Sequence, residues 1–293
     1  MKSKTAKGNW SLTTRKLRLL AVFLLCFLLF LAVAGFFASS RLTVQGISGA
    51  RQRPRRLKSV NEGTEYSLLN PGETGDDSVT SIPFQVLSWR PRAVYFPNFA
   101  TPEQCQGVIK MAEPRLRPST LALRPGDTEE STKGIRTSSG VFLSAEEDKT
   151  GILDVIEGKI ARATMLPRNH GEAFNILRYE VGQLYKSHYD AFNPTEYGPQ
   201  KSQRVASFLL YLSDVEGGET MFPFENGLNM DASYDFQDCT GLKVKPRKGD
   251  GLLFYSLFPN ATIDPMSLHG SCPVIRGVKW VATKWIRDQE QDD

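Results

Sequence analysis

The chain is poor in histidine and cysteine, and its 293 residues include only three of the former and four of the latter. The segment 1–58 contains no aspartate or glutamate, although it holds 12 lysines and arginines. The rest of the chain carries 24 basic against 32 acidic side chains, a net charge of −8, which disfavours nucleic acid as a partner. A hydrophobic share of 40% is ample for a buried core, so wholesale disorder and collagen-like repetition are excluded.

An uncharged apolar run, 19–38, follows the basic head of the chain, 1–18. At the helical rise this run just spans a hydrocarbon core, so it predicts a transmembrane signal anchor. Six cations precede it and three follow it closely, the last at Arg53, so the positive-inside rule places the head in the cytosol and the rest in the lumen. The alternative is a cleaved signal peptide, because Ala32-Val33-Ala34 offers small residues at a suitable spacing. The run continues past this site through Phe36 and Phe37, which favours the anchor.

The chain beyond the apolar run divides into a stem and a folded domain. Residues 39–82 are polar without a sustained period, which predicts a flexible lumenal stem. Within residues 83–293, the segments TPEQ at 101–104 and SAEE at 144–147 each predict the start of a helix. The two helices are expected to pack on one side of a sheet. Residues 117–140 between them predict a long loop, which is more often functional than idle.

Short apolar runs separated by turn residues fill the chain after Pro167 and predict an all-β sandwich or barrel. The runs are AFNILRYEV, RVASFLLYLSD, GLKVKPRKGD, GLLFYSLF and VKWVATKWI. In the last run alternate residues share one face of the strand, and these are Lys279, Val281, Thr283 and Trp285.

One of the three histidines stands two positions from a carboxylate, in His188-Tyr189-Asp190. On a strand these two side chains point to the same side, and His269, far along the chain from Asp190, can complete a ligand set from a later strand. Two imidazoles and one carboxylate on one face of an octahedron leave three positions open, as in non-haem Fe(II) oxygenases. Without further signs, the favoured interpretation of His188 is a core histidine whose hydrogen bonds are satisfied.

Lys279 follows His269 on the final apolar run, among residues with the composition of a core. An Fe(II) oxygenase that uses 2-oxoglutarate needs a fixed cation for the far carboxylate of that cosubstrate. A buried lysine is rare unless it is paired, so an inward Lys279 implies an anionic partner. Periodicity alone leaves open an exposed lysine on an edge strand.

Three segments carry a family resemblance, namely GEAFNILRYEVGQLYKSHYDAF, SQRVASFLLYLSDVEGGETMFP and KPRKGDGLLFYSLFPNATIDPMSLHGSCPVIRGVKWVATKWI. From about Phe84 to Ile286 the chain resembles the plant-type prolyl 4-hydroxylases, a branch of the Fe(II)/2-oxoglutarate dioxygenases. RTSSG at 136–140 matches the end of that family's mobile substrate loop. The resemblance implies an α+β fold with a mainly β catalytic core, a double-stranded β-helix (jelly roll) flanked by helices. The oxygenase core is expected at about residues 172–287.

The resemblance also implies an activity, the hydroxylation of peptidyl proline to 4-hydroxyproline in secreted Pro-rich proteins of the hydroxyproline-rich glycoprotein type. This reaction is of the procollagen-proline 4-dioxygenase class, and it converts 2-oxoglutarate to succinate and CO2. The implied cofactors are Fe(II), 2-oxoglutarate, O2 and L-ascorbate. Two alternatives remain open: another 2-oxoglutarate oxygenase of the secretory pathway, acting on lysyl or small-molecule substrates, and a catalytically silent binding subunit.

Matched position by position, the family pattern assigns roles to a set of individual side chains. The implied iron ligands are His188, Asp190 and His269. The implied 2-oxoglutarate residues are Lys279, Tyr179 and Thr220, and the implied peptide-groove residues are Glu172, Tyr185, Arg204 and Trp285. The groove and 2-oxoglutarate residues other than Lys279 are also consistent with core aromatics, a turn residue and solvated charges. Arg287 departs from the family, which commonly has histidine there, and its effect on substrate preference is left open.

The remaining expectations concern covalent modification and location. Cys239 and Cys272 fall in the oxygenase core and are expected to form a disulfide, the alternative being two free buried thiols. Cys26 lies in the apolar run and Cys105 on a predicted helix face. Asn260, in Asn-Ala-Thr, is the expected lumenal glycosylation acceptor. The anchor predicts a single-pass type II protein of the endoplasmic reticulum membrane, with the Golgi as the alternative. Its oligomeric state is not predicted.

Overall fold

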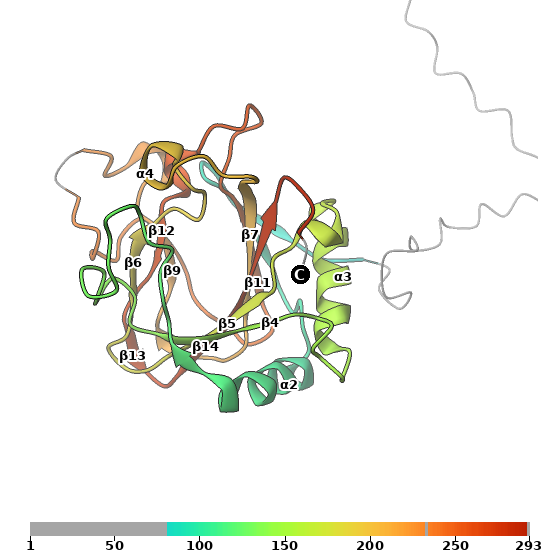
Figure 1. The fold of residues 1–293 in the computed structure, drawn as a ribbon. Coiled ribbons are helices and arrows are strands. Elements are labelled where there is room, and N and C mark those ends of the chain that lie inside the picture. Colours follow the sequence, from blue (N-terminus) through green and yellow to red (C-terminus); the bar gives the residue numbers. More distant parts are fainter. Residues whose placement is uncertain (1–80, 232–233, 292–293) are drawn as a thin grey trace, which may run out of the picture. The chain divides into compact units, whose positions relative to one another are not determined.

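The computed structural model describes residues 81–231 and 234–291 (Figure 1). The predicted cytosolic head, the transmembrane anchor at 19–38 and the stem as far as residue 80 lie outside the described residues. Among the residues that are described, no helix is both long enough and apolar enough to cross a membrane.

Two antiparallel sheets form the core of the described part of the chain. The larger sheet holds, in order, β1 (Gln85–Trp89), β2 (Arg92–Phe96), β11 (Gly251–Tyr255), β7 (Arg204–Tyr211), β14 (Lys279–Arg287), β5 (Phe174–Tyr179), β4 (Ser139–Leu143) and β3 (Arg117–Pro118). The smaller sheet holds β10 (Leu242–Val244), β9 (Thr220–Phe222), β12 (His269–Ser271) and β6 (Tyr185–His188). The short strands β8 (Glu216–Gly217) and β13 (Val274–Arg276) pair with each other. The predicted mainly β core is therefore confirmed.

Strand alternation divides the larger sheet into an inner and an outer face. Inward residues of β5, β7 and β14 pack against Phe222 and Val244 of the smaller sheet, so the two sheets enclose a common interior (Figure 1). On β14 the inward residues are those predicted from the sequence, and they line a cavity. The outward residues Trp280, Ala282 and Ile286 belong to a second hydrophobic cluster.

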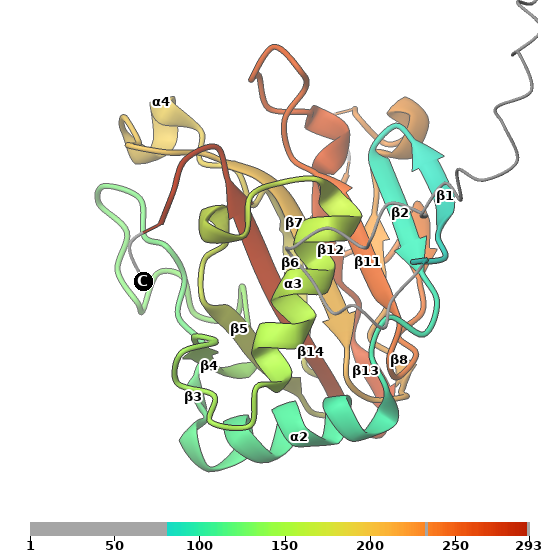
Figure 2. The same cartoon turned by 90° about the vertical axis from the view of Figure 1, so that its right-hand side faces the viewer.

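Two helices cover the outer face of the larger sheet, as predicted (Figure 2). Helix α2 (Pro102–Ala112) begins where the sequence indicated, because Thr101 and Gln104 form a reciprocal capping box. Helix α3 (Ile152–Thr164) does not begin at the predicted SAEE segment. Ser144 and Glu147 do exchange hydrogen bonds, but only within a turn. The Asp148 carboxylate instead accepts the Leu153 N–H at 2.8 Å, so the true helix start lies several residues later.

Among the outward residues of the described strand β14, only Lys284 is charged. It is 3% exposed and forms an ion pair with Glu157 of α3, which also binds Arg168. This buried pair joins α3 to the sheet, since either charge alone would be costly at this depth.

Two further expectations about loops and cysteines are settled by the structure. The 117–140 segment is largely loop, although its ends pair as β3 and the beginning of β4. Cys239 and Cys272 form the predicted disulfide, with a Cα–Cα distance of 5.4 Å. The bridge fastens the segment before β10 to the end of β12, beside the inner cavity.

Candidate active site

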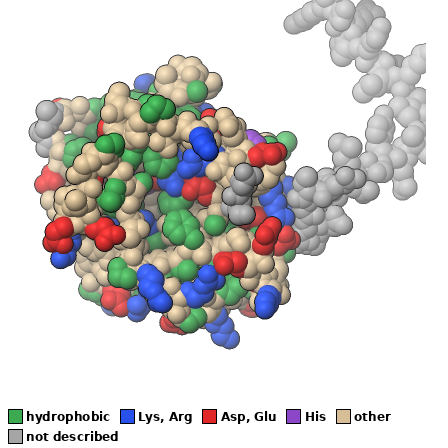
Figure 3. Space-filling view, in the orientation of Figure 1, with side chains coloured by type: hydrophobic (Ala, Val, Ile, Leu, Met, Phe, Trp, Pro, Cys, Tyr) green, Lys and Arg blue, Asp and Glu red, His purple; other side chains and the backbone are tan. Residues whose placement is uncertain are grey.

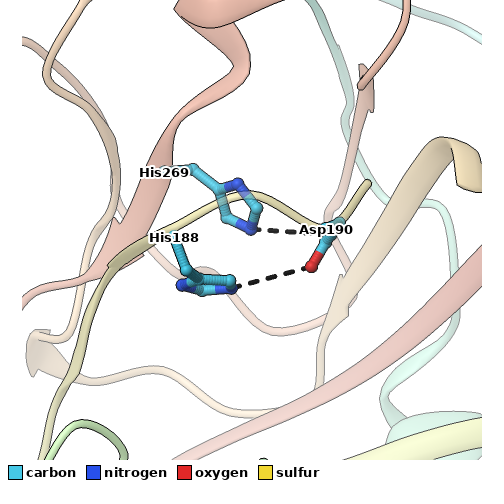
Figure 4. A group of neighbouring side chains, drawn as sticks. All are labelled: His188, Asp190 and His269. Carbon is cyan, nitrogen blue, oxygen red and sulfur yellow. Dashed lines mark ion pairs between the residues drawn. The ribbon is translucent and has the colours of Figure 1, made fainter. Parts of the chain in front are cut away.

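The three predicted metal-ligating side chains converge at one end of the barrel (Figure 4). Strand β6 ends at His188, strand β12 begins at His269, and the antiparallel register sets the two residues opposite each other. Asp190 lies beyond the end of β6, so a bend in the chain, and not strand alternation as the sequence pattern suggested, brings its carboxylate to the histidines. The His188 and His269 Nε2 atoms lie 3.6 and 3.5 Å from the carboxylate oxygens.

The backbone sets the tautomer of both imidazoles. Nδ1 of His188 lies 2.8 Å from the Lys186 carbonyl oxygen, and Nδ1 of His269 lies 2.9 Å from that of Ser267. A carbonyl can only accept, so each Nδ1 carries a proton and each Nε2 is the ring nitrogen left to ligate a metal. Both Nε2 atoms face the Asp190 carboxylate, which is the arrangement that a metal ligand set requires.

The electrostatics of the group suit a divalent cation. Burial lowers the pKa of His269 to about 4, so this imidazole is neutral and able to ligate near pH 7. Burial opposes ionisation of Asp190, but the two histidines and Arg204 hold the pKa of its carboxyl below the usual range. Ser207 of β7 donates a 2.5 Å hydrogen bond to Asp190 Oδ2 and fixes the orientation of the carboxylate. Two imidazole nitrogens and one carboxylate oxygen fit Fe(II).

Lys279 opens β14 and points into the interior, so the alternative of an exposed edge lysine is wrong. The residue is 1% exposed, and its Nζ donates a 2.8 Å hydrogen bond to Ser271 Oγ. Among the described residues it forms no ion pair. Burial lowers the pKa of its ammonium group to about 7, with Glu219 opposing the shift. The interior thus contains a lysine that is costly to charge and has no carboxylate partner.

A cavity brings together most of the predicted site residues. Its lining includes His188, Asp190, His269, Lys279, Tyr179, Thr220, Tyr185 and Trp285. Tyr179 lies opposite Lys279 in the pairing of β5 with β14, and its ring centre is 5.2 Å from Nζ. The Thr220 hydroxyl accepts a 2.8 Å hydrogen bond from Tyr211. Figure 3 shows a hollow on the open face of the barrel, where hydrophobic side chains lie beside charged ones.

The predicted groove residues form two aromatic and arginine stacks beside this cavity. The Arg204 guanidinium lies 3.7 Å from the centre of the Trp285 ring and donates two 2.7 Å hydrogen bonds to Glu172. Glu172 also accepts a 2.6 Å hydrogen bond from Arg287 Nε, and the two arginines outweigh the effect of burial and lower its pKa. The buried Trp285 Nε1 finds no hydrogen-bond partner among the described residues.

In the second stack, Tyr185 lies against the His188 ring with centroids 3.6 Å apart. The Arg136 guanidinium lies 4.8 Å from the centre of the Tyr185 ring. Arg136 also lines the cavity, so the end of the 117–140 segment forms part of its wall.

Sequence reasoning missed several residues of the site. Ser207 and Ser271 bind the functional side chains directly, and Arg136 was seen only as part of a loop motif. A signal for Ser207 does exist, because it is a small polar residue within the apolar run of β7 that follows Arg204. No comparable pattern marks Ser271, since its contact with Lys279 depends on the approach of two strands that are not adjacent in the sheets.

Comparison with known proteins finds an oxygenase family model and prolyl 4-hydroxylase relatives, and the relatives align over nearly the whole chain. The profile of the 2OG-Fe(II) oxygenase superfamily matches residues 174–287. The chain is 66% identical to probable prolyl 4-hydroxylase 9 of Arabidopsis thaliana, over 95% of this chain and 96% of that protein. It is 57% identical to prolyl 4-hydroxylase 13 of the same plant, over 92% and 95% respectively. A solved structure, the viral collagen prolyl hydroxylase of Paramecium bursaria Chlorella virus-1 with 2OG, aligns at a TM-score of 0.48 and 25% identity, covering 67% of this chain and 95% of that one.

The buried charge of Lys279 predicts an unusual dependence of stability on pH. Between its folded pKa of about 7 and its unfolded value of 10.5, the unfolded chain binds more protons, so the free energy of unfolding rises with pH. In the metal-free, ligand-free protein, Lys279→Met should raise that free energy by roughly 4 kcal/mol at pH 7 and remove most of the rise. Denaturant titrations at several pH values measure both effects.

Lys284→Met is the matched control, because Lys284 is buried with a carboxylate partner. It should destabilise the protein, since it deprives Glu157 of a cation. If Lys279→Met and Lys284→Met lowered the free energy of unfolding by similar amounts, the conclusion that Lys279 lacks an ion-pair partner would be wrong.

Proposed function

Since the chain belongs to the plant-type prolyl 4-hydroxylase family of 2-oxoglutarate-dependent oxygenases, we propose that its proline hydroxylation takes place at a metal held by His188, Asp190 and His269. The observation that carries this assignment is the convergence of two Nε2 atoms on one carboxylate, beside a buried lysine that forms no ion pair with any described residue. Bound there, Fe(II) with 2-oxoglutarate and O2 supplies the oxidation of the C4–H bond to C4–OH, coupled to release of succinate and CO2.

Lys279 is proposed to bind the far carboxylate of 2-oxoglutarate. A dicarboxylate entering the cavity would meet its ammonium group, which Ser271 already orients. Tyr179 and Thr220 line the same wall and carry hydroxyl groups that can donate to that carboxylate. The anion also restores the charged form of the lysine, because an opposite charge raises the pKa that burial has lowered.

The peptide is proposed to lie along the aromatic and arginine stacks as an extended polyproline II helix. That conformation leaves its carbonyl oxygens without internal hydrogen bonds, so they are free to accept from the protein. Arg204, held flat on Trp285 by Glu172, provides such donors and a planar face for a proline ring.

Finer features of the activity are part of this proposal. The substrates would be Pro-rich secretory polypeptides, the reaction would be of the procollagen-proline type, and L-ascorbate would serve as reductant. The presence of all three candidate ligands and Lys279 argues against a silent binding subunit. The first stack favours a peptide over a small-molecule substrate, because Arg204 and Glu172 extend it from Trp285 beyond the lining of the cavity that holds the ligands.

The activity is tested by incubating the detergent-solubilised chain with a Pro-rich peptide, a lysyl peptide, Fe(II), 2-oxoglutarate and ascorbate. Mass spectrometry should find one added oxygen on proline and none on lysine, with succinate formed in step. Asp190→Ala should abolish both products because it removes a ligand, whereas the exposed Asp154→Ala on α3 should not. Full activity of Asp190→Ala would refute the metal assignment.

The cosubstrate assignment is tested on Lys279→Met, which leaves the far carboxylate of 2-oxoglutarate buried without a cation. The cost is on the order of 3–5 kcal/mol, so 2-oxoglutarate affinity should fall roughly 100-fold to several thousand-fold. Lys279→Arg should recover part of the loss, because it restores the charge with a different reach. Iron content should stay unchanged in both variants. An unaltered 2-oxoglutarate saturation curve would show that this lysine does not bind the cosubstrate.

We propose further that the catalytic domain, residues 83–293, lies in the lumen of the endoplasmic reticulum, held by the anchor at 19–38. The Cys239–Cys272 disulfide supports an oxidising compartment. Asn260 is exposed, and its side chain accepts from Thr262, so its acceptor motif is accessible for glycosylation. In sealed microsomes, external protease should shorten the chain only by its head. A soluble form that begins near Gly35 would instead establish a cleaved signal.

A further inference from the structure

The Gln203 side chain holds the backbone of Phe192, at a point of the chain shortly after the candidate ligand Asp190. Its Oε1 accepts the Phe192 N–H at 2.8 Å, and its Nε2 donates to the Phe192 carbonyl at 2.7 Å. One amide thus satisfies both backbone groups of Phe192, as a neighbouring strand would. Gln203 is itself fixed, because its backbone N–H and C=O both bind Asp288.

The ring of Phe192 faces the arginines of the peptide groove. The Arg204 and Arg287 guanidinium groups lie 5.0 and 5.6 Å from its centre. Arg204 therefore contacts two aromatic side chains, Trp285 and Phe192. Each such contact contributes about 0.5–2 kcal/mol, so removal of Phe192 would free one side of Arg204.

The same ring extends the contacts outward to a second segment. Phe192 packs edge-on against Tyr197 of the short helix α4 (Pro194–Tyr197), with ring centroids 5.3 Å apart. Arg124, from the loop of residues 119–138, lies 5.6 Å from the centre of the Tyr197 ring. It also forms a 2.9 Å ion pair with Glu196. Figure 2 shows α4 and this loop projecting from the same side of the barrel.

An exposed ion pair of this kind contributes at most about 1 kcal/mol, so the contact between the loop and α4 can form and break readily. Its consequences can nevertheless reach the groove, because the contacts are continuous from Arg124 through Tyr197 and Phe192 to Arg204. None of these contacts involves the candidate metal ligands or Lys279.

We propose that Phe192 and Gln203 are positioning residues, which couple docking of the 119–138 loop through Arg124 to the placement of Arg204 against the peptide. This inference rests on the proposed role of Arg204 in peptide binding. Docking of the loop favours the position of α4 in which Phe192 holds Arg204 on Trp285. This coupling strengthens peptide binding and does not change 2-oxoglutarate binding.

The test is a double-mutant cycle on the full chain, with KM measured separately for a Pro-rich peptide and for 2-oxoglutarate. Arg124→Ala should raise the peptide KM roughly three- to fivefold, and Phe192→Leu roughly tenfold, with the 2-oxoglutarate KM unchanged in both. In the double variant the peptide KM should not exceed that of Phe192→Leu, because Arg124 acts through the ring. Phe192→Tyr, which keeps the ring, should resemble the unsubstituted chain.

Gln203→Glu provides an independent arm, because it keeps the shape of the side chain but cannot donate to the Phe192 carbonyl. It should also raise the peptide KM roughly tenfold, whereas Gln85→Glu, on the exposed end of β1, should not.

Two results would overturn the coupling. Multiplying effects of Arg124→Ala and Phe192→Leu would show that the loop contact acts independently, and an equal rise in the 2-oxoglutarate KM would indicate general damage to the fold. The proposed groove is tested separately by Arg204→Ala. If Arg204→Ala leaves the peptide KM unaltered, the groove assignment is wrong. If Arg204→Ala raises the peptide KM but the effects of Arg124→Ala and Phe192→Leu multiply, the groove assignment stands and only the coupling is wrong.

Discussion

The pairing of β6 with β12 is the constraint on which the rest of the site depends. Its register sets His188 opposite His269, and a slip of one residue would turn one imidazole to the other face of the sheet. Gly270 permits the close approach, because a Cβ there would lie 3.0 Å from the Tyr185 carbonyl oxygen and 3.2 Å from the Ser187 nitrogen. The disulfide at Cys272 fastens the far end of the same strand. Register, close backbone approach and a covalent bridge thus act on one short strand, and together they fix where the two imidazoles lie.

Strand β14 shows how one element serves stability on one face and ligand binding on the other. Its two buried lysines differ in their partners. Lys284 forms an ion pair with Glu157 of α3, whereas in the part of the chain that the structure describes Lys279 has only a hydroxyl within hydrogen-bond reach. The outward pair costs little net free energy, because each charge compensates the desolvation of the other. The inward lysine lacks that compensation, and such a cost is typical of a group whose partner arrives with a ligand.

The sequence predicted those parts of the molecule that follow from local periodicity. Alternation on β14 grouped Lys279 with Val281, Thr283 and Trp285 on one face, and the capping pattern at Thr101 located the start of α2. It failed where tertiary contacts override local patterns. Asp190 reaches the histidines through a bend, and Asp148 moves the start of α3 away from the residues with the better capping pattern. The residues that support the candidate site were the least predictable part, because the hydrogen bonds of Ser207 and Ser271 depend on contacts between separate segments of the chain, and only Ser207 has a local signal in the sequence.

The hydrogen bonds from each Nδ1 to a carbonyl two positions earlier have a consequence for the choice of metal. Because the local backbone orients each imidazole, both Nε2 atoms face the carboxylate before any ion arrives. A site that is complete in advance requires little rearrangement from the incoming ion, so it offers little means of rejecting a competitor of similar size. The intrinsic affinity series then favours cobalt, nickel, copper and zinc over iron. Correct loading would therefore depend on which divalent ions the surrounding compartment supplies, and a mismetallated protein should be folded as well as an active one.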